Sequence, residues 1–435
     1  MLVINSITAV FLIDKICLKS RRRIPKYYEY FWCYLIIIFS FLNSKILNTE
    51  VQDFIDYNLN QDISKIIFKG SPFSEITIQE LANQITAKKK SERKLPTWFQ
   101  CKNIYYPPKI SIEQTSSEIT AKYKSEIVKG ESLIDLTGGF GIDSFYFSKR
   151  ITHVTHCEIN SDLSKIVACN YNVLGVNNIE TKATDGIRFL VEQNGIKFDW
   201  VYIDPSRRDD SKNKVFLLKD CAPNVPEELD NLFLKTNNIL IKVSPILDIT
   251  STIRELKYVK EVHIVAIQNE VKELLFVLEK NFSNDPKIIA INIKKSNIEE
   301  FEFNLLEKNS TGSYSMPLKY LYEPNSAILK SGGFEIVTHK FNVNKIQQHS
   351  HLYTSDKLTN FPGRSFLIEK VIPYNKKEIK KHLPSKKANI TVRNFPKTVA
   401  QVRKETKLSD GGNIYIFFTT LNNGSKVMII SEKIN

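Results

Sequence analysis

Four acidic side chains follow apolar runs of the chain at positions that suit the binding of a polar ligand. Asp135 ends "SLID", Glu158 ends "HVTHCE", Asp185 lies in "KATDGIRFL" and Asp204 ends "FDWVYID". The carboxyl ends of neighbouring parallel strands meet at one edge of an open sheet, where ligands bind. We therefore expect these carboxylates to gather around one ligand. The alternatives are a surface glutamate at Glu158, a helix N-cap at Asp185 and a turn cap at Asp204.

Three glycines, Gly138, Gly139 and Gly141, follow Asp135 in "DLTGGFGIDSFYFSKR". Without a Cβ atom they let the chain turn sharply and let its backbone approach a ligand. The spacing G-G-x-G does not fit the G-x-G-x-x-G pattern of dinucleotide sites. An acidic residue just before the turn fits a loop that binds S-adenosylmethionine, where it holds the amino-acid part of the cofactor directly or through water. A carboxylate at Glu158 can accept hydrogen bonds from both ribose hydroxyls, and one at Asp185 can accept a hydrogen bond from the adenine amino group.

Asp204 is followed by Pro205, Ser206, Arg207 and Arg208. An acidic residue before proline at a strand end is the reactive position of many methyltransferases that modify bases, so Asp204 and the Pro205 carbonyl could hold an exocyclic amine. Amino-group methyltransferases commonly carry a second proline and an aromatic residue after it. Ser206 and Arg207 depart from that pattern, although a guanidinium plane can stack on a base or bind a phosphate.

The elements that must position these residues alternate between strand and helix from Leu133 to Leu278. This alternation predicts a parallel sheet flanked by helices. The expected strands are Ser132–Leu136, His153–Glu158, Asp199–Ile203, Ile239–Val243, Val262–Ile267 and Leu274–Leu278. Only "QNEVKE" separates the last two strands, which is too short for a helical crossover, so we expect them to pair antiparallel.

The regions on either side of this sheet have other patterns. Residues 43–131 read as helical, with a capping-box signature at Thr77–Glu80. After Asn281 two strands and a helix capped by Asn325 are expected. From about Arg364 the order is strand, helix ("NKKEIKKHL"), strand, helix and a closing hairpin, which is compatible with a small α+β domain.

The length of 435 residues allows two to four domains. Six widely spaced cysteines without a C-x-x-C pair indicate reduced thiols in a cytosolic protein, and no metal-ligand pattern is present. The run Tyr30–Leu42 is apolar but too short for a comfortable membrane span. We interpret residues 1–42 as a non-native upstream extension, with a weak membrane anchor as the alternative.

The net charge of +14 is concentrated near the C-terminus. The stretch 374–407, called the basic segment below, holds eleven Lys or Arg residues and two acids. Such a density of positive charge suits a phosphate backbone, and Tyr374, Phe395 and His382 could stack on unpaired bases. The alternative is a solvated basic face. The candidate RNA-binding residues are Lys386, Lys387, Arg393, Lys397, Arg403 and Lys404.

Several of these motifs together resemble a known family. "SLIDLTGGFGIDSFYFSK", "HCEIN", "ATDGIRFL" and "VYIDPSRRD" resemble class I S-adenosylmethionine-dependent methyltransferases. More narrowly, "IEQTSSEITAKYKSEIV", "YLYEPNSAILKSGG" and "HSHLYTSD" resemble a bacterial group with ferredoxin-like and THUMP-like domains after the catalytic one. The resemblance covers roughly residues 43–435. It implies a Rossmann-like sheet with an antiparallel last strand and an association with RNA.

The resemblance also implies a set of site residues. Gln114 and Thr115 would help to close over the cofactor. Together with the residues identified above, the candidate cofactor-binding set is Gln114, Thr115, Asp135, Thr137, Gly138, Gly139, Gly141, Glu158, Ile159, Asp185 and Gly186, and the candidate catalytic set is Asp204, Pro205 and Arg207.

These observations lead to one hypothesis and its alternatives. The chain is predicted to be a cytoplasmic S-adenosylmethionine-dependent methyltransferase that modifies a base, at a nitrogen, of ribosomal or transfer RNA without a metal. The alternatives are methylation of DNA or of a small anionic metabolite, or a non-catalytic RNA-binding protein. The expected domains are a helical region at 43–131, a methyltransferase domain at 132–280, a ferredoxin-like domain at 281–352 and a THUMP-like domain at 353–435.

Overall fold

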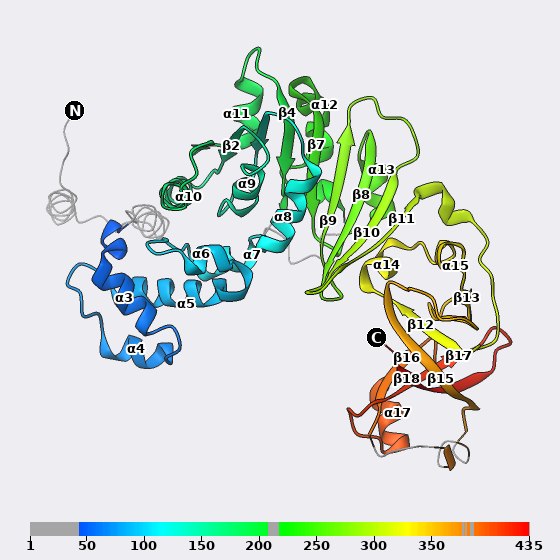
Figure 1. Cartoon of the computed structure of the whole chain (residues 1–435). Coiled ribbons are helices and arrows are strands. Elements are labelled where there is room, and N and C mark those ends of the chain that lie inside the picture. The colour runs from blue at the N-terminus through cyan, green and yellow to red at the C-terminus, as the bar shows by residue number, and fades with distance from the viewer. Residues whose placement is uncertain (1–42, 208–216, 376–377, 379–380, 383–386, 435) are drawn as a thin grey trace, which may run out of the picture. The chain divides into compact units, whose positions relative to one another are not determined.

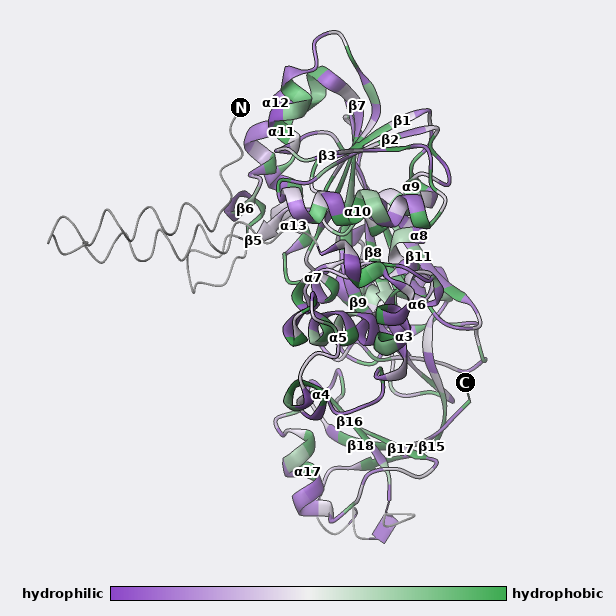
Figure 2. Ribbon diagram, turned by 90° about the vertical axis from the view of Figure 1, so that its left-hand side faces the viewer, coloured by the Kyte–Doolittle hydropathy of each residue, from purple (hydrophilic) through white to green (hydrophobic). Residues whose placement is uncertain are grey.

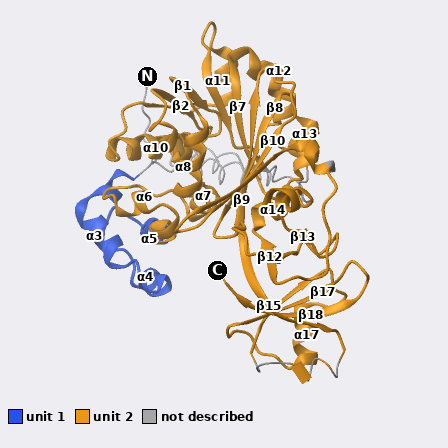
Figure 3. Ribbon diagram, turned by 45° about the vertical axis from the view of Figure 1, so that its right-hand side comes forward, with its two compact units in different colours: residues 1–86 blue, residues 87–435 orange. Residues whose placement is uncertain are grey.

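The computed structural model describes residues 43–207, 217–375, 378, 381–382 and 387–434 (Figure 1). The expected extension at 1–42 and most of the helix expected in "NKKEIKKHL" lie outside these residues. The chain divides into two compact units, residues 1–86 and 87–435 (Figure 3), and each is described by itself.

The first unit is helical where it is described, as predicted. Its core includes Ile46, Val51 and Ile55. At Thr77, Oγ1 accepts from the Glu80 backbone N–H (3.2 Å) while the Glu80 carboxylate accepts from the Thr77 N–H (2.7 Å), so the expected capping box is formed. The elements are η1 (Ser44–Leu47), α3 (Thr49–Tyr57), α4 (Ile63–Lys69) and the start of α5 (Ile78–Lys94).

The second unit begins with the rest of α5 and three short helices that lead into a sheet. They are α6 (Pro96–Gln100), α7 (Lys109–Gln114) and α8 (Glu118–Ile127). Pro96 occupies the first turn of α6, where its missing N–H costs nothing. Ser117 caps α8 by accepting a hydrogen bond from the Thr120 N–H (3.2 Å). The cap fixes the start of α8, the last helix before the first strand.

Nine strands form the large sheet, in the order β11-β10-β8-β9-β7-β4-β1-β2-β3. The strands from β7 to β3 in this order run parallel, and β9 lies antiparallel between β7 and β8. The predicted Rossmann-like sheet and its antiparallel strand are confirmed. The strands are β1 (Ser132–Asp135), β2 (His153–Cys157), β3 (Ile179–Lys182), β4 (Phe198–Ile203), β7 (Thr236–Val243), β8 (Val259–Ile267), β9 (Glu270–Glu279), β10 (Lys287–Ile293) and β11 (Ile298–Asn304).

Alternate residues of the strands bury two different cores, because successive side chains point to opposite faces. On one face Ile134 packs with Leu190 and Leu229 of two helices, and on the other Leu133 packs with Phe147. Helix α12 carries both hydrophobic and hydrophilic residues, and its buried residues include Leu229 (Figure 2). The helices are α9 (Ile142–Phe147), α10 (Ser161–Val173), α11 (Gly186–Glu192), α12 (Val225–Lys235) and α13 (Ile249–Glu255).

A second sheet has seven strands, in the order β13-β14-β12-β15-β18-β17-β16, and a short third sheet pairs β5 with β6. The closing hairpin expected from the sequence is confirmed as the antiparallel pair of β17 and β18. Asn325 caps α14 as predicted, because its side chain accepts from the Ile328 N–H (3.0 Å). The elements are η3 (Leu305–Asn309), β12 (Tyr320–Pro324), α14 (Ser326–Ser331), α15 (Ile336–Phe341), β13 (Asn344–Lys345), β14 (Tyr353–Ser355), β15 (Gly363–Pro373), β16 (Asn389–Arg393), α17 (Val399–Thr406), β17 (Ile414–Thr420) and β18 (Lys426–Lys433).

Candidate active site

A cavity of about 540 Å³ opens at the carboxyl ends of β1, β2 and β4. The four predicted carboxylates, Asp135, Glu158, Asp185 and Asp204, all line it. The cavity is also lined by Gln114, Thr115, Thr137, Gly138, Gly139, Ile159 and Gly186, whereas Gly141 and Pro205 are not among its lining residues. The structure therefore brings together most of the residues that the sequence singled out.

The glycines of the loop after β1 have different physical roles. A Cβ at Gly138 would lie 2.2 Å from His156 Nε2, and one at Gly141 (φ +78°) would lie 2.2 Å from the Tyr171 hydroxyl. These two glycines make room for buried side chains of the protein. At Gly139 (φ +55°) the nearest atom would be 3.9 Å away. Only Gly139 of the three thus borders open space, where a ligand could approach the backbone.

Glu158 follows β2 and is held by two backbone amides. Its Oε2 accepts from the Gly139 N–H (2.9 Å) and its Oε1 accepts from the Asn160 N–H (2.7 Å). These contacts fix the carboxylate at the edge of the cavity beside the open face of Gly139. Each carboxylate oxygen retains a further lone pair, so Glu158 can still accept hydrogen bonds from two hydroxyl groups of a ligand.

Asp185 and Asp135 occupy contrasting environments. Asp185 caps α11 by accepting from the Arg188 N–H (2.9 Å), so the helix-capping interpretation holds while the residue also lines the cavity. Asp135 is buried. Burial raises its pKa to about 7, although hydrogen bonds from Ser144 Oγ (2.7 Å) and the Thr137 N–H (3.0 Å) act in the opposite direction.

The raised pKa of Asp135 predicts a pH-dependent stability. The folded protein keeps Asp135 protonated up to about pH 7, whereas the unfolded chain ionises it near its ordinary value of 3.8. Its contribution to stability is therefore fully present below about pH 4 and is lost as the pH rises through 7, by up to about 1.4 kcal/mol per pH unit. We expect Asp135→Asn to flatten the decline in the free energy of unfolding between pH 5 and 7, measured by urea titration. Parallel pH profiles of the variant and the wild type would contradict this assignment.

Asp204, at the end of β4, pairs with a lysine that the sequence analysis did not single out. The Asp204 carboxylate forms an ion pair with Lys242 Nζ of β7, and the Asp204 N–H donates to Thr137 Oγ1 (2.7 Å). Burial lowers the pKa of Lys242, but the carboxylates of Asp204, Asp143 and Glu273 outweigh burial, and the pKa lies above its usual value. Lys242 is therefore a permanent cation beside Asp204.

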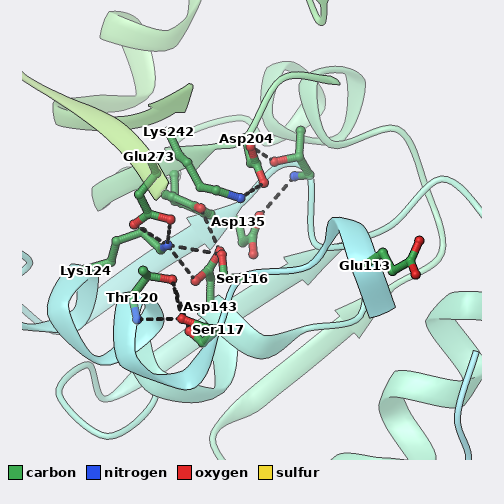
Figure 4. Close-up of polar contacts among 12 residues, drawn as sticks. Glu113, Ser116, Ser117, Thr120, Lys124, Asp135, Asp143, Asp204, Lys242 and Glu273 are labelled. Atoms are coloured by element: carbon green, nitrogen blue, oxygen red, sulfur yellow. Dashed lines mark hydrogen bonds and ion pairs between the residues drawn. The ribbon is translucent and has the colours of Figure 1, made fainter. Parts of the chain in front are cut away.

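A second group of charged residues is buried beside this pair (Figure 4). Lys124 of α8, which is fully buried, donates to both carboxylate oxygens of Glu273 in β9 (2.8 Å each) and lies 3.2 Å from Asp143 Oδ1. Asp143 Oδ2 accepts from Ser116 Oγ and from the Tyr202 hydroxyl, both at 2.8 Å. These contacts tie the segment before β1 to α9, β4 and β9. The sequence signal for Lys242 and Glu273 is a charged residue inside an apolar strand, as in "ILIKVSP" and "VKELLFVL".

After Asp204 the chain forms a two-residue strand, β5 (Ser206–Arg207), which pairs with β6 (Cys221–Ala222), just after the 3-10 turn η2 (Leu218–Asp220). Ser206 lines the cavity. The side chain of Arg207 and the whole of Arg208 lie outside the described residues, so their predicted roles at the substrate stay predictions.

Several positive charges of the basic segment are paired with carboxylates of the protein, so fewer are available to a phosphate backbone than its composition indicates. Arg393 Nη2 pairs with Glu323 (2.8 Å), Lys397 pairs with Glu405 (2.7 Å) and Arg403 pairs with Asp410. Lys387 and Lys404 are exposed, and Lys386 lies outside the described residues. The rings of Tyr374 and Phe395 pack edge-to-face on each other, with centroids 4.9 Å apart, and both contact Phe418. These two aromatic residues therefore serve the domain core in part, and their predicted role in base stacking stays untested.

Three further findings concern the described residues alone. None of their helices has the length and apolar character that a membrane crossing requires. They hold no cluster of His, Cys, Asp or Glu suited to a metal ion. Within them the cysteines Cys101, Cys157, Cys169 and Cys221 are free thiols.

Comparison with known proteins agrees with this geometry. Residues 320–362 match the family model of a ferredoxin-like domain, and residues 363–433 match that of a THUMP domain-like domain. The ferredoxin-like match begins after β10 and β11, which belong to the nine-stranded sheet, although the expected middle domain began at residue 281. The domain boundaries themselves stay a prediction. No curated protein shows significant similarity to the chain.

Among solved structures, one from Porphyromonas gingivalis W83, described as a "putative methyltransferase", is 30% identical with a TM-score of 0.81. The match covers 91% of this chain and 100% of the other. An rRNA methylase from Streptococcus thermophilus (16% identity, TM-score 0.28) matches 38% of this chain and 98% of its own. A ribosomal protein L11 methylase from Lactobacillus delbrueckii subsp. bulgaricus (13%, 0.27) matches 38% of this chain and 77% of its own. The TM-scores of these two methylases are too low to support an inference about this chain.

The sheet order, the glycine loop and the carboxylates at the strand ends define a class I methyltransferase fold. Within that class the chain belongs to the bacterial family of S-adenosylmethionine-dependent methyltransferases with ferredoxin-like and THUMP-like C-terminal domains, which includes the Porphyromonas gingivalis protein.

Proposed function

We propose that this protein is a cytoplasmic methyltransferase that transfers a methyl group from S-adenosylmethionine to structured RNA. The observation that carries the proposal is the single cavity on which Asp135, Glu158, Asp185 and Asp204 converge. When bound, the cofactor supplies an electrophilic methyl group on a sulfonium, so the protein needs to supply only position and polar alignment.

The residues of the cavity fit this cofactor. Gly139 leaves open space beside Glu158, whose fixed carboxylate can accept the two ribose hydroxyls. Asp185, which also lines the cavity, would accept a hydrogen bond from the adenine amino group. Asp135, once ionised, would hold the ammonium group of the methionine part, and Gln114 and Thr115 would close over it. Among the four carboxylates, Asp204 follows β4 and Asp185 follows β3, so these two lie at opposite ends of the row β4-β1-β2-β3. The methyl acceptor would enter beside Asp204.

RNA as the substrate is supported by the THUMP-like match and by the charge of the basic segment. The test is mass spectrometry of modified nucleosides in total RNA from cells with and without the gene. We expect one methylated nucleoside to disappear from a single RNA species in the deletion strain and to return on complementation. Identical modification profiles in the two strains would overturn the proposal.

We predict that exposed lysines of the basic segment contribute to RNA affinity. The double variant Lys387→Glu/Lys404→Glu should weaken binding and flatten the dependence of log K on log salt, by about 0.7 for each phosphate that the variant no longer neutralises. Binding is measured by fluorescence anisotropy over a salt series. The matched control is Lys65→Glu/Lys69→Glu in α4, which makes the same charge change outside the segment. Equal effects of the two double variants would move the RNA surface away from the basic segment.

A further inference from the structure

The Asp204 carboxylate is neutralised by a fixed cation. The Lys242 side chain is only 13% exposed, and its ammonium group pairs with Asp204, which is 34% exposed and lines the cavity (Figure 4). Lys242 also faces the carboxylates of Asp143 and Glu273. Glu273 is held in turn by both hydrogen bonds from the buried Lys124. The position and the charge of Lys242 are therefore set by three elements, β4, α9 and β9.

This pair favours one kind of methyl acceptor over another. When an amine nitrogen attacks a sulfonium, positive charge develops on the nitrogen, and an adjacent ammonium group destabilises that charge. When a hydroxyl oxygen attacks, it loses its proton and approaches an alkoxide. A carboxylate beside the oxygen can accept the proton, and an ammonium group paired with that carboxylate favours the developing negative charge through its electrostatic field.

The lining of the cavity is consistent with an acceptor that is not a base. Enzymes that act on a base commonly extrude it and stack it against an aromatic or apolar side chain. Among the described residues that line the cavity, the aromatic ones are Phe140 and Tyr202, which are 3% and 1% exposed and offer no open ring face. The exposed apolar residue of the lining, Ile159 (74% exposed), belongs to the proposed cofactor-binding set. The position after Asp204-Pro205 that carries a second proline in amino-group methyltransferases holds Ser206.

We propose that the methyl acceptor is a ribose 2′-hydroxyl group of the RNA, and that Lys242 is the positioning residue that orients Asp204 toward it. This inference rests on the proposed RNA methyltransferase function and replaces the base nitrogen predicted from the sequence. The hydroxyl oxygen forms a bond to the methyl carbon, and the carbon–sulfur bond breaks with its electron pair remaining on sulfur. The hydroxyl proton passes to the Asp204 carboxylate and then to water.

The direct test is the position of the methyl group in the product. Full-length protein is incubated with S-adenosylmethionine carrying a labelled methyl group and with total RNA from cells that lack the gene, and the nucleosides are analysed by fragmentation. We expect the label on the ribose fragment and resistance of the adjacent phosphodiester to alkali. Label on a base fragment would overturn this inference and leave the proposed function standing. No label in RNA would overturn both.

The role of Lys242 is tested separately by two variants. Lys242→Met should lower kcat about 10²-fold with little change in cofactor affinity, because the residue is not among those that line the cavity. Lys242→Arg, which keeps the charge, should recover part of that loss. The matched control is Lys260→Met, which breaks another lysine–carboxylate pair of the same sheet (Lys260–Glu279, 2.6 Å). A Lys242→Met variant as active as the control, or an arginine variant as inactive as methionine, would overturn the role of Lys242.

Discussion

Replacing Asp204 with asparagine should abolish most methyl transfer while leaving the cofactor site almost intact. The asparagine carbonyl can still accept from Lys242 and fill the same space, but it cannot take up a proton from the acceptor. We expect the turnover number to fall by about 10²- to 10⁴-fold, the range of a lost general base. Cofactor affinity should change little, because Glu158 and Asp185, which we propose to hold the nucleoside, line the cavity from other elements.

Two measurements separate this outcome from a general loss of folding. Rates of methyl transfer to RNA give the turnover number, and calorimetry with S-adenosylhomocysteine gives the affinity of the cofactor site. Asp230→Asn is the matched control, because Asp230 also pairs with a lysine, Lys257 (2.8 Å), and does not line the cavity. If Asp204→Asn reduced affinity and turnover by the same factor, Asp204 would be a cofactor ligand instead.

Much of the catalytic sheet can be predicted from the sequence because it is encoded locally. Each apolar run that ends in an acidic residue becomes a strand whose carboxylate lies at the shared edge, as at Asp135 and Asp204. The short "QNEVKE" connection forces an antiparallel pair, and the turn at Gln268 and Asn269 adopts positive φ angles (50° and 66°), which asparagine tolerates. The strand β3 was not predicted, since "IETK" is short and largely polar.

The partners of the site residues cannot be predicted in the same way. Lys242 and Asp204 are far apart in the chain and meet only because β7 lies beside β4 in the sheet. Likewise, Lys124 reaches Glu273 across elements separated by more than a hundred residues. The glycine loop shows the same limit. Its composition indicated close approach of a ligand, but His156 and Tyr171 occupy the space at two of the three glycines.

The basic segment illustrates a further limit of composition. Counting charges treats every lysine and arginine as available, whereas the fold places Glu323 beside Arg393 and Glu405 beside Lys397. Glu323 lies in β12, seventy residues before Arg393, and also pairs with Arg364. Arg364 links β12 to the adjacent strand β15, and Arg393 links it to β16 at the edge of the seven-stranded sheet. The surface charge available to RNA is therefore smaller than the formal excess.

Glu158→Ala should produce the second large effect, a loss of cofactor affinity of roughly 10²-fold or more. A charge-assisted hydrogen bond contributes about 1.5–3 kcal/mol, and the carboxylate can accept two from a ribose. The variant also leaves the Gly139 and Asn160 N–H groups without their acceptor. Calorimetry with S-adenosylhomocysteine measures the loss. Glu180→Ala, on the neighbouring strand and outside the cavity, is the matched control.

A second ligand distinguishes lost ribose contacts from a disturbed glycine loop. The wild-type protein should bind S-adenosylhomocysteine more tightly than its 2′-deoxy analogue, because the analogue lacks one of the hydroxyls that we propose to donate to Glu158. In Glu158→Ala this preference should vanish, since neither ligand then has a carboxylate to meet. A variant that binds both ligands weakly but keeps the full preference would show that Glu158 acts on the loop through Gly139 and that another residue recognises the ribose.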